Sequence, residues 1–130
     1  MASKLAPYLS YPDASAVIAW LEAIGFTVVV RQDGPGGRVM HSELRMDEVV
    51  VMVASDDNDY VVAPLVGSST GAGLYVVSDD VDLLYTAAIS GGGVSVFPPE
   101  DTEWGTRRAR VLDPGGREWS FGSYEPGVRR

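Results

Sequence analysis

The chain has a single histidine, and a glutamate follows it two positions later. His41 and Glu43 lie in a stretch, 38–45, where side chains alternate with the period of two that is typical of a β-strand. Side chains two positions apart on a strand project from the same face, so Glu43 can orient and charge the imidazole of His41. Such a pair can act as a general acid/base or as a polar clamp on a ligand. The alternative is an ordinary pair on an exposed strand.

A tryptophan in a turn-rich segment is the second feature that could do chemistry. Trp104 lies within 98–105 and has acidic neighbours, namely Glu100, Asp101 and Glu103. An exposed tryptophan ring is costly unless a contact uses it. Either Trp104 stacks on a ligand at the mouth of a cavity, where acidic neighbours favour a cation, or it anchors the loop to the core or to a second chain.

The composition excludes several classes of function. Eighteen acidic residues against ten basic ones give a net charge of -8, which disfavours nucleic acid and anionic membranes as partners. The lack of cysteine excludes disulfides and thiol catalysis, and a single histidine excludes a histidine-rich metal site within one chain. No apolar run reaches the roughly 18 residues of a membrane helix, and the N-terminus does not read as a signal peptide. We expect a cytoplasmic protein that contacts neither nucleic acid nor membrane.

Two similar runs of sequence, 13–29 and 78–94, are offset by half the length of the chain. Apolar residues recur in each run at the spacing of an amphipathic helix. Aspartates at the start and glycines at the end are typical of helix caps. The expected caps are Asp13 and Gly25 for the first helix, and Asp79 or Asp80 with Gly91–Gly93 for the second.

Strands are predicted around each helix. One strand precedes each helix and three follow it, so the chain is read as βαβββ twice. The expected strands are 5–10, 26–32, 38–45 and 48–54 in the first half, and 73–77, 94–97, 107–112 and 118–123 in the second, where a turn at 113–116 joins the last two. We therefore expect one domain, 1–130, with module 1 at about 4–54, a linker at 55–71 and module 2 at about 72–124.

A doubled βαβββ unit of this length resembles the vicinal oxygen chelate superfamily, which includes glyoxalase I, extradiol dioxygenases and bleomycin-resistance proteins. PDASAVIAWLEAIGF resembles its first helix, and LYVVSDDVDLLYTAAISGGG resembles its second strand and helix. EDTEWGTRRARVLDPGGREWSFGSYEP resembles the closing WG-x-R…DP-x-G…W-x-F segment of the glyoxalase/bleomycin-resistance branch. The resemblance implies an α+β fold whose two modules form an open, curved mixed sheet around a concave cavity. That fold hosts both metalloenzymes and drug-binding proteins.

The enzymes of this superfamily bind a divalent metal through His, Glu or Gln side chains on the first and last strand of each module. The first strands of this sequence offer none of these residues. Val50 or Met52 stands where the last strand of module 1 would supply a carboxylate, and Ser120 stands at the glutamate position of module 2. Glu48 and Glu118 open those two strands, off the matched positions. The comparison with the family pattern therefore predicts a protein without a metal or other cofactor.

The resemblance also places side chains at the cavity. Val50 and Met52 are expected to face it, which suits an apolar or aromatic ligand. Arg107 matches the arginine of the closing segment, and it either contacts the ligand or braces the loop by pairing with Asp101 or Glu103.

Alternation along the strands separates the remaining positions into core and surface. Met40, Ser42 and Leu44 are expected to face the helix, with His41 and Glu43 on the other side. Trp119 and Phe121 are expected in the core, and Arg108 and Arg110 are expected to face solvent or a partner chain.

The resemblance favours a metal-free protein that binds a small cationic or aromatic molecule, as a homodimer that sequesters an antibiotic such as bleomycin. The acidic surface would steer a cation toward it. The expected binding residues are His41, Glu43, Val50, Met52, Trp104, Arg107 and Ser120. One alternative is an atypical metal-independent enzyme that uses His41 and Glu43 as acid and base. Another is a noncatalytic partner or regulatory subunit.

Overall fold

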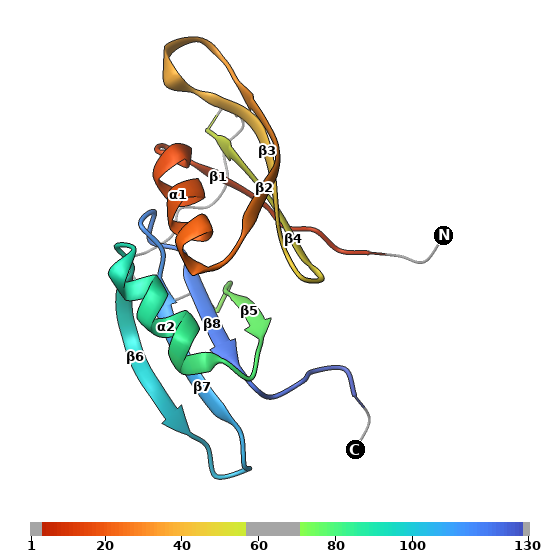
Figure 1. The fold of residues 1–130 in the computed structure, drawn as a ribbon, viewed down its shortest axis with the longest axis vertical. Helices are drawn as coiled ribbons and strands as arrows, with labels where there is room; N and C mark the ends of the chain where they lie inside the picture. The colour runs from red at the N-terminus through yellow and green to blue at the C-terminus, as the bar shows by residue number, and fades with distance from the viewer. Residues whose placement is uncertain (1–3, 57–70, 129–130) are drawn as a thin grey trace.

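The order β-α-β-β-β occurs twice along the chain (Figure 1). This computed structural model describes residues 4–56 and 71–128, so most of the predicted linker lies outside the described residues. Module 1 consists of β1 (Tyr8–Tyr11), α1 (Ala14–Ile24), β2 (Thr27–Asp33), the 3-10 turn η1 (Pro35–Gly37), β3 (Val39–Met46) and β4 (Val49–Ser55). Module 2 consists of β5 (Leu74–Val77), α2 (Val81–Ser90), β6 (Val94–Asp101), β7 (Arg107–Leu112) and β8 (Glu118–Gly122). The predicted α+β fold of two βαβββ modules is confirmed.

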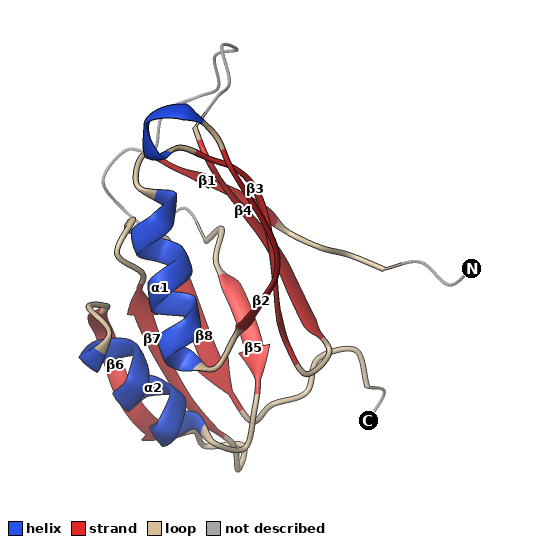
Figure 2. Ribbon diagram, turned by 45° about the horizontal axis from the view of Figure 1, so that its top comes forward, coloured by secondary structure: helices blue, strands red, loops and turns tan. Residues whose placement is uncertain are grey.

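Each module forms its own four-stranded mixed sheet (Figure 2). The strand order is β1-β4-β3-β2 in the sheet of module 1, here called sheet A, and β5-β8-β7-β6 in that of module 2, called sheet B. In both sheets the first strand runs parallel to the last, and the other neighbours are antiparallel. Tyr8 pairs with Met52 in sheet A, and Tyr75 pairs with Ser120 in sheet B, so the two halves are built alike.

The helices begin and end where their capping residues predict. The Asp13 carboxylate accepts a hydrogen bond from the backbone N–H of Ala16 at 3.1 Å, and Gly25 ends α1 with a φ of 121° that favours glycine. Asp80 occupies the cap position of α2, but its side chain makes no capping hydrogen bond. Its backbone N–H instead donates to Ser78 Oγ at 3.0 Å. Neither helix is long and apolar enough to cross a membrane, within the segments that the structure describes.

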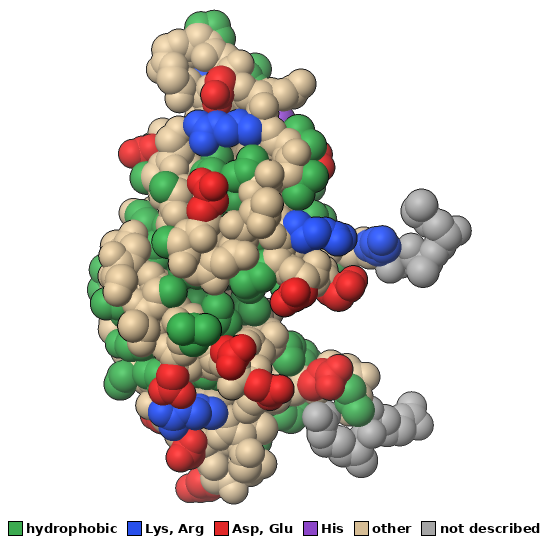
Figure 3. All heavy atoms as spheres, viewed as in Figure 1, with side chains coloured by type: hydrophobic (Ala, Val, Ile, Leu, Met, Phe, Trp, Pro, Cys, Tyr) green, Lys and Arg blue, Asp and Glu red, His purple; other side chains and the backbone are tan. Residues whose placement is uncertain are grey.

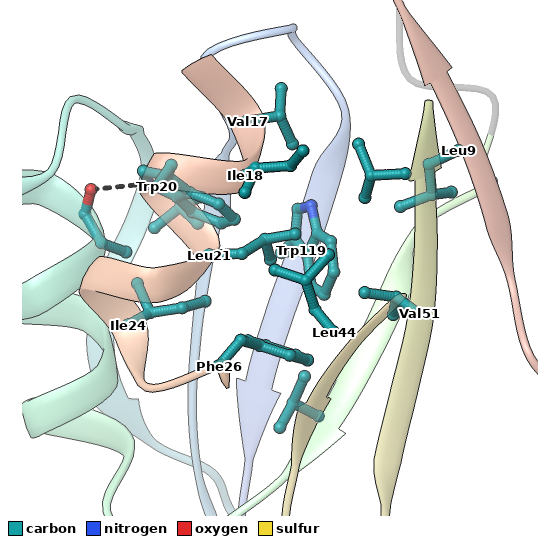
Figure 4. Packing of buried hydrophobic residues seen from close by; sticks show 14 of the residues in the cluster. Leu9, Val17, Ile18, Trp20, Leu21, Ile24, Phe26, Leu44, Val51 and Trp119 are labelled. Carbon is teal, nitrogen blue, oxygen red and sulfur yellow. Dashed lines mark hydrogen bonds between the residues drawn. The ribbon is translucent and has the colours of Figure 1, made fainter. Parts of the chain in front are cut away.

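One hydrophobic core is shared by both modules (Figure 4). Trp119 and Phe121 of β8 are buried in it, as the sequence predicts. The Trp20 ring of α1 packs edge-on against Trp119 with 5.7 Å between centroids, and its Nε1 donates to the Ala88 carbonyl of α2 at 2.9 Å. Because α1 contacts elements of both halves, apolar burial holds the two modules against each other.

A buried carboxylate adds a polar connection between the modules. Asp113, which is 2% exposed, follows β7 and accepts hydrogen bonds from Tyr11 Oη of β1 at 2.6 Å and from Trp119 Nε1 at 2.9 Å. Its other oxygen accepts from the backbone N–H groups of Gly115 and Arg117 at 2.9 and 3.0 Å. Burial and the adjacent carboxylate raise the pKa of the Tyr11 hydroxyl, which stays protonated as a donor.

Strand β6 is longer than the sequence predicts. It continues through Pro98 and Pro99 to Asp101, where the sequence analysis places a loop. Proline lacks the N–H that a central strand needs, but β6 is the outer strand of sheet B and is interrupted by two register shifts. The 98–105 segment is therefore half strand and half hairpin tip, and Trp104 lies at that tip.

The start of β3 also departs from the predicted alternation of buried and exposed side chains. Val39 is 1% exposed and Met40 is 53% exposed, so Met40 does not join Ser42 and Leu44 on the buried face. The β2–β3 pairing shifts between Gln32 and Asp33, opposite this point, and the shift reverses the side-chain alternation locally. The prediction for Met40 is wrong, whereas Ser42 and Leu44 are fully buried as expected.

Candidate ligand-binding site

A cavity with a volume of about 410 Å³ lies on the open face of sheet B. Arg108, Arg110 and Ser120 point into it, because they alternate along β7 and β8 with the buried side chains of the core. The β6–β7 hairpin supplies one wall and the segment after β8 supplies another. The lining residues are Tyr75, Phe97, Thr102, Trp104, Thr106, Arg108, Ala109, Arg110, Ser120 and Tyr124.

Aromatic rings and guanidinium groups alternate along the β6–β7 side of this cavity. The Arg108 guanidinium carbon lies 5.3 Å from the centroid of Phe97 and 5.7 Å from that of Trp104. The Arg110 guanidinium carbon lies 5.4 Å from the same Phe97 centroid. At these distances both guanidinium groups make cation–π contacts with the Phe97 ring that lies between them. Trp104 is 61% exposed, so most of its surface remains open to a ligand.

The opposite wall is formed by Tyr75 of β5. Its hydroxyl donates to the Tyr124 carbonyl at 2.7 Å, and burial raises the pKa of this hydroxyl. The ring lies over Gly122 so closely that a β-carbon at that glycine would overlap with Tyr75 Oη. A glycine at position 122 is therefore required for the observed placement of this wall.

Sequence reasoning expected Arg108 and Arg110 to face solvent or a partner chain and did not assign them to a cavity. Both lie on the open face of sheet B, where they line the cavity. Arg107, predicted at the ligand, lies outside the cavity lining and braces the hairpin. Its Nη1 donates to Asp101 Oδ1 at 2.9 Å, as one of the predicted alternatives states, and its Nε and Nη2 donate to the carboxylate of Asp82 on α2 at 2.8 Å.

Arg107 and Asp82 form an ion pair in which each residue shifts the pKa of the other. Hydrogen bonds to Asp82 and then to Asp101 raise the pKa of the Arg107 guanidinium, and the same arginine lowers the pKa of Asp82. Arg108 and Arg110 alternate in the sequence with the apolar Ala109 and Val111. That pattern alone places the two arginines on the open face of the sheet.

A second cavity, of about 200 Å³, lies on sheet A. His41 and Met52 line it, and Glu43 contacts His41 with 2.7 Å between Glu43 Oε2 and His41 Nε2. Both side chains of this pair are partly exposed. Val50 shares a strand face with Met52 but is not among the lining residues, which are Tyr8, Leu9, Ser10, His41, Met52, Val53 and Ala54.

The predicted site residues are therefore divided between two cavities. His41 and Met52 belong to the cavity on sheet A, and Trp104 and Ser120 belong to the cavity on sheet B. The division follows from strand pairing, because each module completes its own sheet. Sequence reasoning also missed Phe97 and Tyr124, which accompany Trp104 and Tyr75 in the lining of the cavity on sheet B.

Paired βαβββ modules with open, ligand-sized cavities define a class of fold, and comparison with known proteins identifies the family. Residues 6–121 match the sequence profile of the Glyoxalase/Bleomycin resistance protein/Dioxygenase superfamily. The chain belongs to this superfamily. It is 31% identical over 123 residues to the uncharacterized protein Mb0911c of Mycobacterium bovis, a match that covers 91% of this chain and 81% of that protein.

Solved structures share the same fold. The crystal structure of TioX from Micromonospora sp. ML1 superposes with a TM-score of 0.75 and 27% identity, covering 95% of this chain and all of that one. A glyoxalase-related enzyme from Fulvimarina pelagi gives a TM-score of 0.69 at 21% identity, covering 93% of this chain and 88% of the other. A glyoxalase I mutant from Zea mays gives 0.68 at 18% identity, covering 92% of this chain and 44% of the other. The last two likenesses concern the fold alone.

The metal that enzymes of this superfamily carry does not fit the residues present at the corresponding strands. The cavity-facing positions are Tyr75 and Ser120 in sheet B, and Tyr8 and Met52 in sheet A. Hydroxyl and thioether groups are poor ligands for a divalent ion compared with imidazole and carboxylate. Within residues 4–56 and 71–128, no three His, Cys, Asp or Glu side chains cluster around a common point.

Proposed function

We propose that this protein is a metal-free binding protein for a small molecule with planar rings, and that the cavity on sheet B is its binding site. The observation that supports this proposal is the cavity wall, where Phe97 and Trp104 are interleaved with two guanidinium groups. The volume of this cavity, about 410 Å³, is within the range of small-molecule sites.

The side chains of the cavity wall favour stacking on a ligand ring over chemical conversion of the ligand. A ring placed between Trp104 and Tyr75 would gain burial plus about 0.5–1.5 kcal/mol for each well-oriented aromatic contact. The ionisable side chains of the lining are two arginines and two tyrosines, and among the described residues no imidazole or carboxylate lines this cavity. A site of this composition holds a ligand and lacks an evident acid or base to transform it.

We further propose that the ligand is an antibiotic with planar aromatic rings and that the protein forms a homodimer. Both cavities are open, and exposed aromatic side chains stand at their edges, Trp104 at one and Tyr8 at the other. A second copy of the chain that covers these edges would bury them and enclose the ligand.

A thermal-shift and calorimetric screen on metal-stripped protein tests the function. We expect a planar aromatic antibiotic to stabilise the fold by roughly 3 kcal/mol at a hundredfold excess over Kd. Trp104→Ala should weaken that binding, while Trp104 fluorescence should change on binding to the unaltered protein. Sedimentation velocity of the same samples reports whether two chains associate.

Two outcomes of this screen would contradict the proposed function. Stabilisation by nickel or zinc, without any aromatic ligand, would return the chain to the metal-dependent enzymes of its family. Protein capture without any small-molecule binding would favour the noncatalytic partner instead.

A second candidate function rests on the His41–Glu43 contact of 2.7 Å in the cavity on sheet A. A carboxylate that orients an imidazole is the arrangement of a general base. If the protein transforms a ligand identified by the screen, mass spectrometry will show product, and His41→Ala will abolish its formation without weakening binding in the cavity on sheet B. Full turnover in His41→Ala would remove this candidate.

A further inference from the structure

We infer that the ligand of the cavity on sheet B is an anion, a planar aromatic carboxylate whose acid group binds Arg110. This inference rests on the proposed function and narrows it to one charge class. It reverses the expectation of a cationic ligand that the net charge of -8 suggests.

Arg110 has an incomplete set of partners in a partly buried position. Its Nε donates to Ser120 Oγ at 2.8 Å, and the guanidinium stands over the Phe97 ring. Among the residues that the structure describes, no carboxylate lies within ion-pair distance of it, whereas Arg31, Arg107 and Arg108 each have an acidic partner. A partly buried charge is stabilised by a counter-ion, so the cavity favours a ligand that supplies one.

Arg110 and Ser120 retain hydrogen-bond donors that match the oxygens of a carboxylate. With Nε engaged, the two terminal nitrogens of Arg110 retain the forked arrangement that matches two carboxylate oxygens. Ser120 Oγ accepts from Arg110, so its own hydroxyl proton is available to donate to a ligand oxygen. Phe97 and the neighbouring strand hold this fork in place before any ligand arrives.

The local charge of the cavity is positive although the protein as a whole is acidic. Arg108 is neutralised by Glu100, with 2.9 Å between Nε and Oε1, which leaves the charge of Arg110 uncompensated. Within the described chain no acidic side chain lines the cavity, and Glu118, on the same face of β8 as Ser120, lies outside the lining. Acidic side chains are scattered over the face shown in Figure 3. Beyond about 8 Å they are largely screened at physiological salt, whereas Arg110 would touch the ligand.

Three probes that share one ring system and differ in charge test the inference. 2-Naphthoate, 2-naphthamide and 2-(aminomethyl)naphthalene are titrated into the full chain by calorimetry at neutral pH and fixed salt. We expect the naphthoate to bind at least about tenfold more tightly than the neutral amide, as a charge-assisted bidentate pair should, and the ammonium to bind most weakly. This preference should shrink as salt is raised.

Arg110→Gln should remove the preference for naphthoate while leaving the affinity for naphthamide within about twofold, since the Phe97 and Trp104 rings remain. Arg31→Gln is the matched control, because it removes the same charge from an exposed ion pair in sheet A and should leave the preference unchanged. Arg110→Lys keeps the charge without the fork and should retain only part of the preference. Thermal melting of each variant confirms that it is folded.

The outcomes separate this inference from the proposed function. Equal affinity for the three probes would overturn the anionic ligand and leave ring binding intact. A preference for naphthoate that survives in Arg110→Gln would overturn the role of Arg110. Failure of all three probes to bind would overturn both the ring-binding function and the inference.

Discussion

Replacing Asp113 by alanine is expected to lower the free energy of unfolding by about 3 kcal/mol or more, because each buried donor left without an acceptor costs about 1–3 kcal/mol. Asp113 is buried and accepts from Tyr11 Oη and Trp119 Nε1 on one oxygen. Tyr11 and Trp119 are both buried, so their donors would be left unsatisfied. The backbone donors of Gly115 and Arg117 lie in a more exposed turn and add less.

Urea unfolding, followed by the change in tryptophan fluorescence, measures this loss. Asp82→Ala is the matched control, since it removes an exposed aspartate that is also bonded to an arginine, and it should cost far less. Tyr11→Phe removes one donor of the Asp113 cluster and should give an intermediate loss of about 1 kcal/mol. An Asp113→Ala protein no less stable than Asp82→Ala would show that the buried carboxylate does not connect the modules energetically.

A side chain at position 122 is expected to reduce the affinity for 2-naphthoate at least tenfold, which corresponds to about 1.4 kcal/mol. A β-carbon there would overlap with Tyr75 Oη and lie 2.8 Å from Cε1 and Cζ of the ring. In Gly122→Ala the Tyr75 ring must swing away and lose its hydrogen bond to the Tyr124 carbonyl. The swing removes one wall of the cavity.

The double variant Gly122→Ala with Tyr75→Ala distinguishes this steric effect from a general loss of folding. If the clash is the cause, adding Gly122→Ala to Tyr75→Ala should change neither the melting temperature nor the affinity further, because the ring it strikes is already absent. Calorimetry and thermal melting of the four proteins complete the cycle. Additive losses in the double variant would refute the account of position 122.

Much of the fold could be predicted because its signals are local. Asp13 and Gly25 bound α1 through capping chemistry that depends only on neighbouring residues. The strand at 107–112 was predicted with its exact bounds, since its alternation is regular and a turn at Asp113 follows. By contrast, the extension of β6 through Pro98 depends on its being an outer strand, and sheet order is not readable from one segment.

The candidate site was predicted less well, for two physical reasons. Which residues share a cavity is decided by long-range strand pairing, so His41 and Ser120 were assigned to one site although they lie on different sheets. The expected cation was taken from the net charge of the chain and the acidic neighbours of Trp104, whereas the proposed anion rests on the local charge of Arg110. Alternation along β7 places Arg110 on the open face of its sheet.

The doubled architecture also bears on how such a protein can acquire new specificities. The inner faces of both modules meet in one core, so a change in Trp20 or Trp119 is felt by the other half of the molecule. The open faces of sheets A and B do not pack into this shared core, so a change there need not be felt by the other module. Tyr8 and Tyr75 occupy matching places in the two sheets, yet an imidazole–carboxylate pair stands near the first and two arginines near the second. A repeated unit thus offers two independently variable surfaces on one common interior, and here they have diverged toward different chemistry.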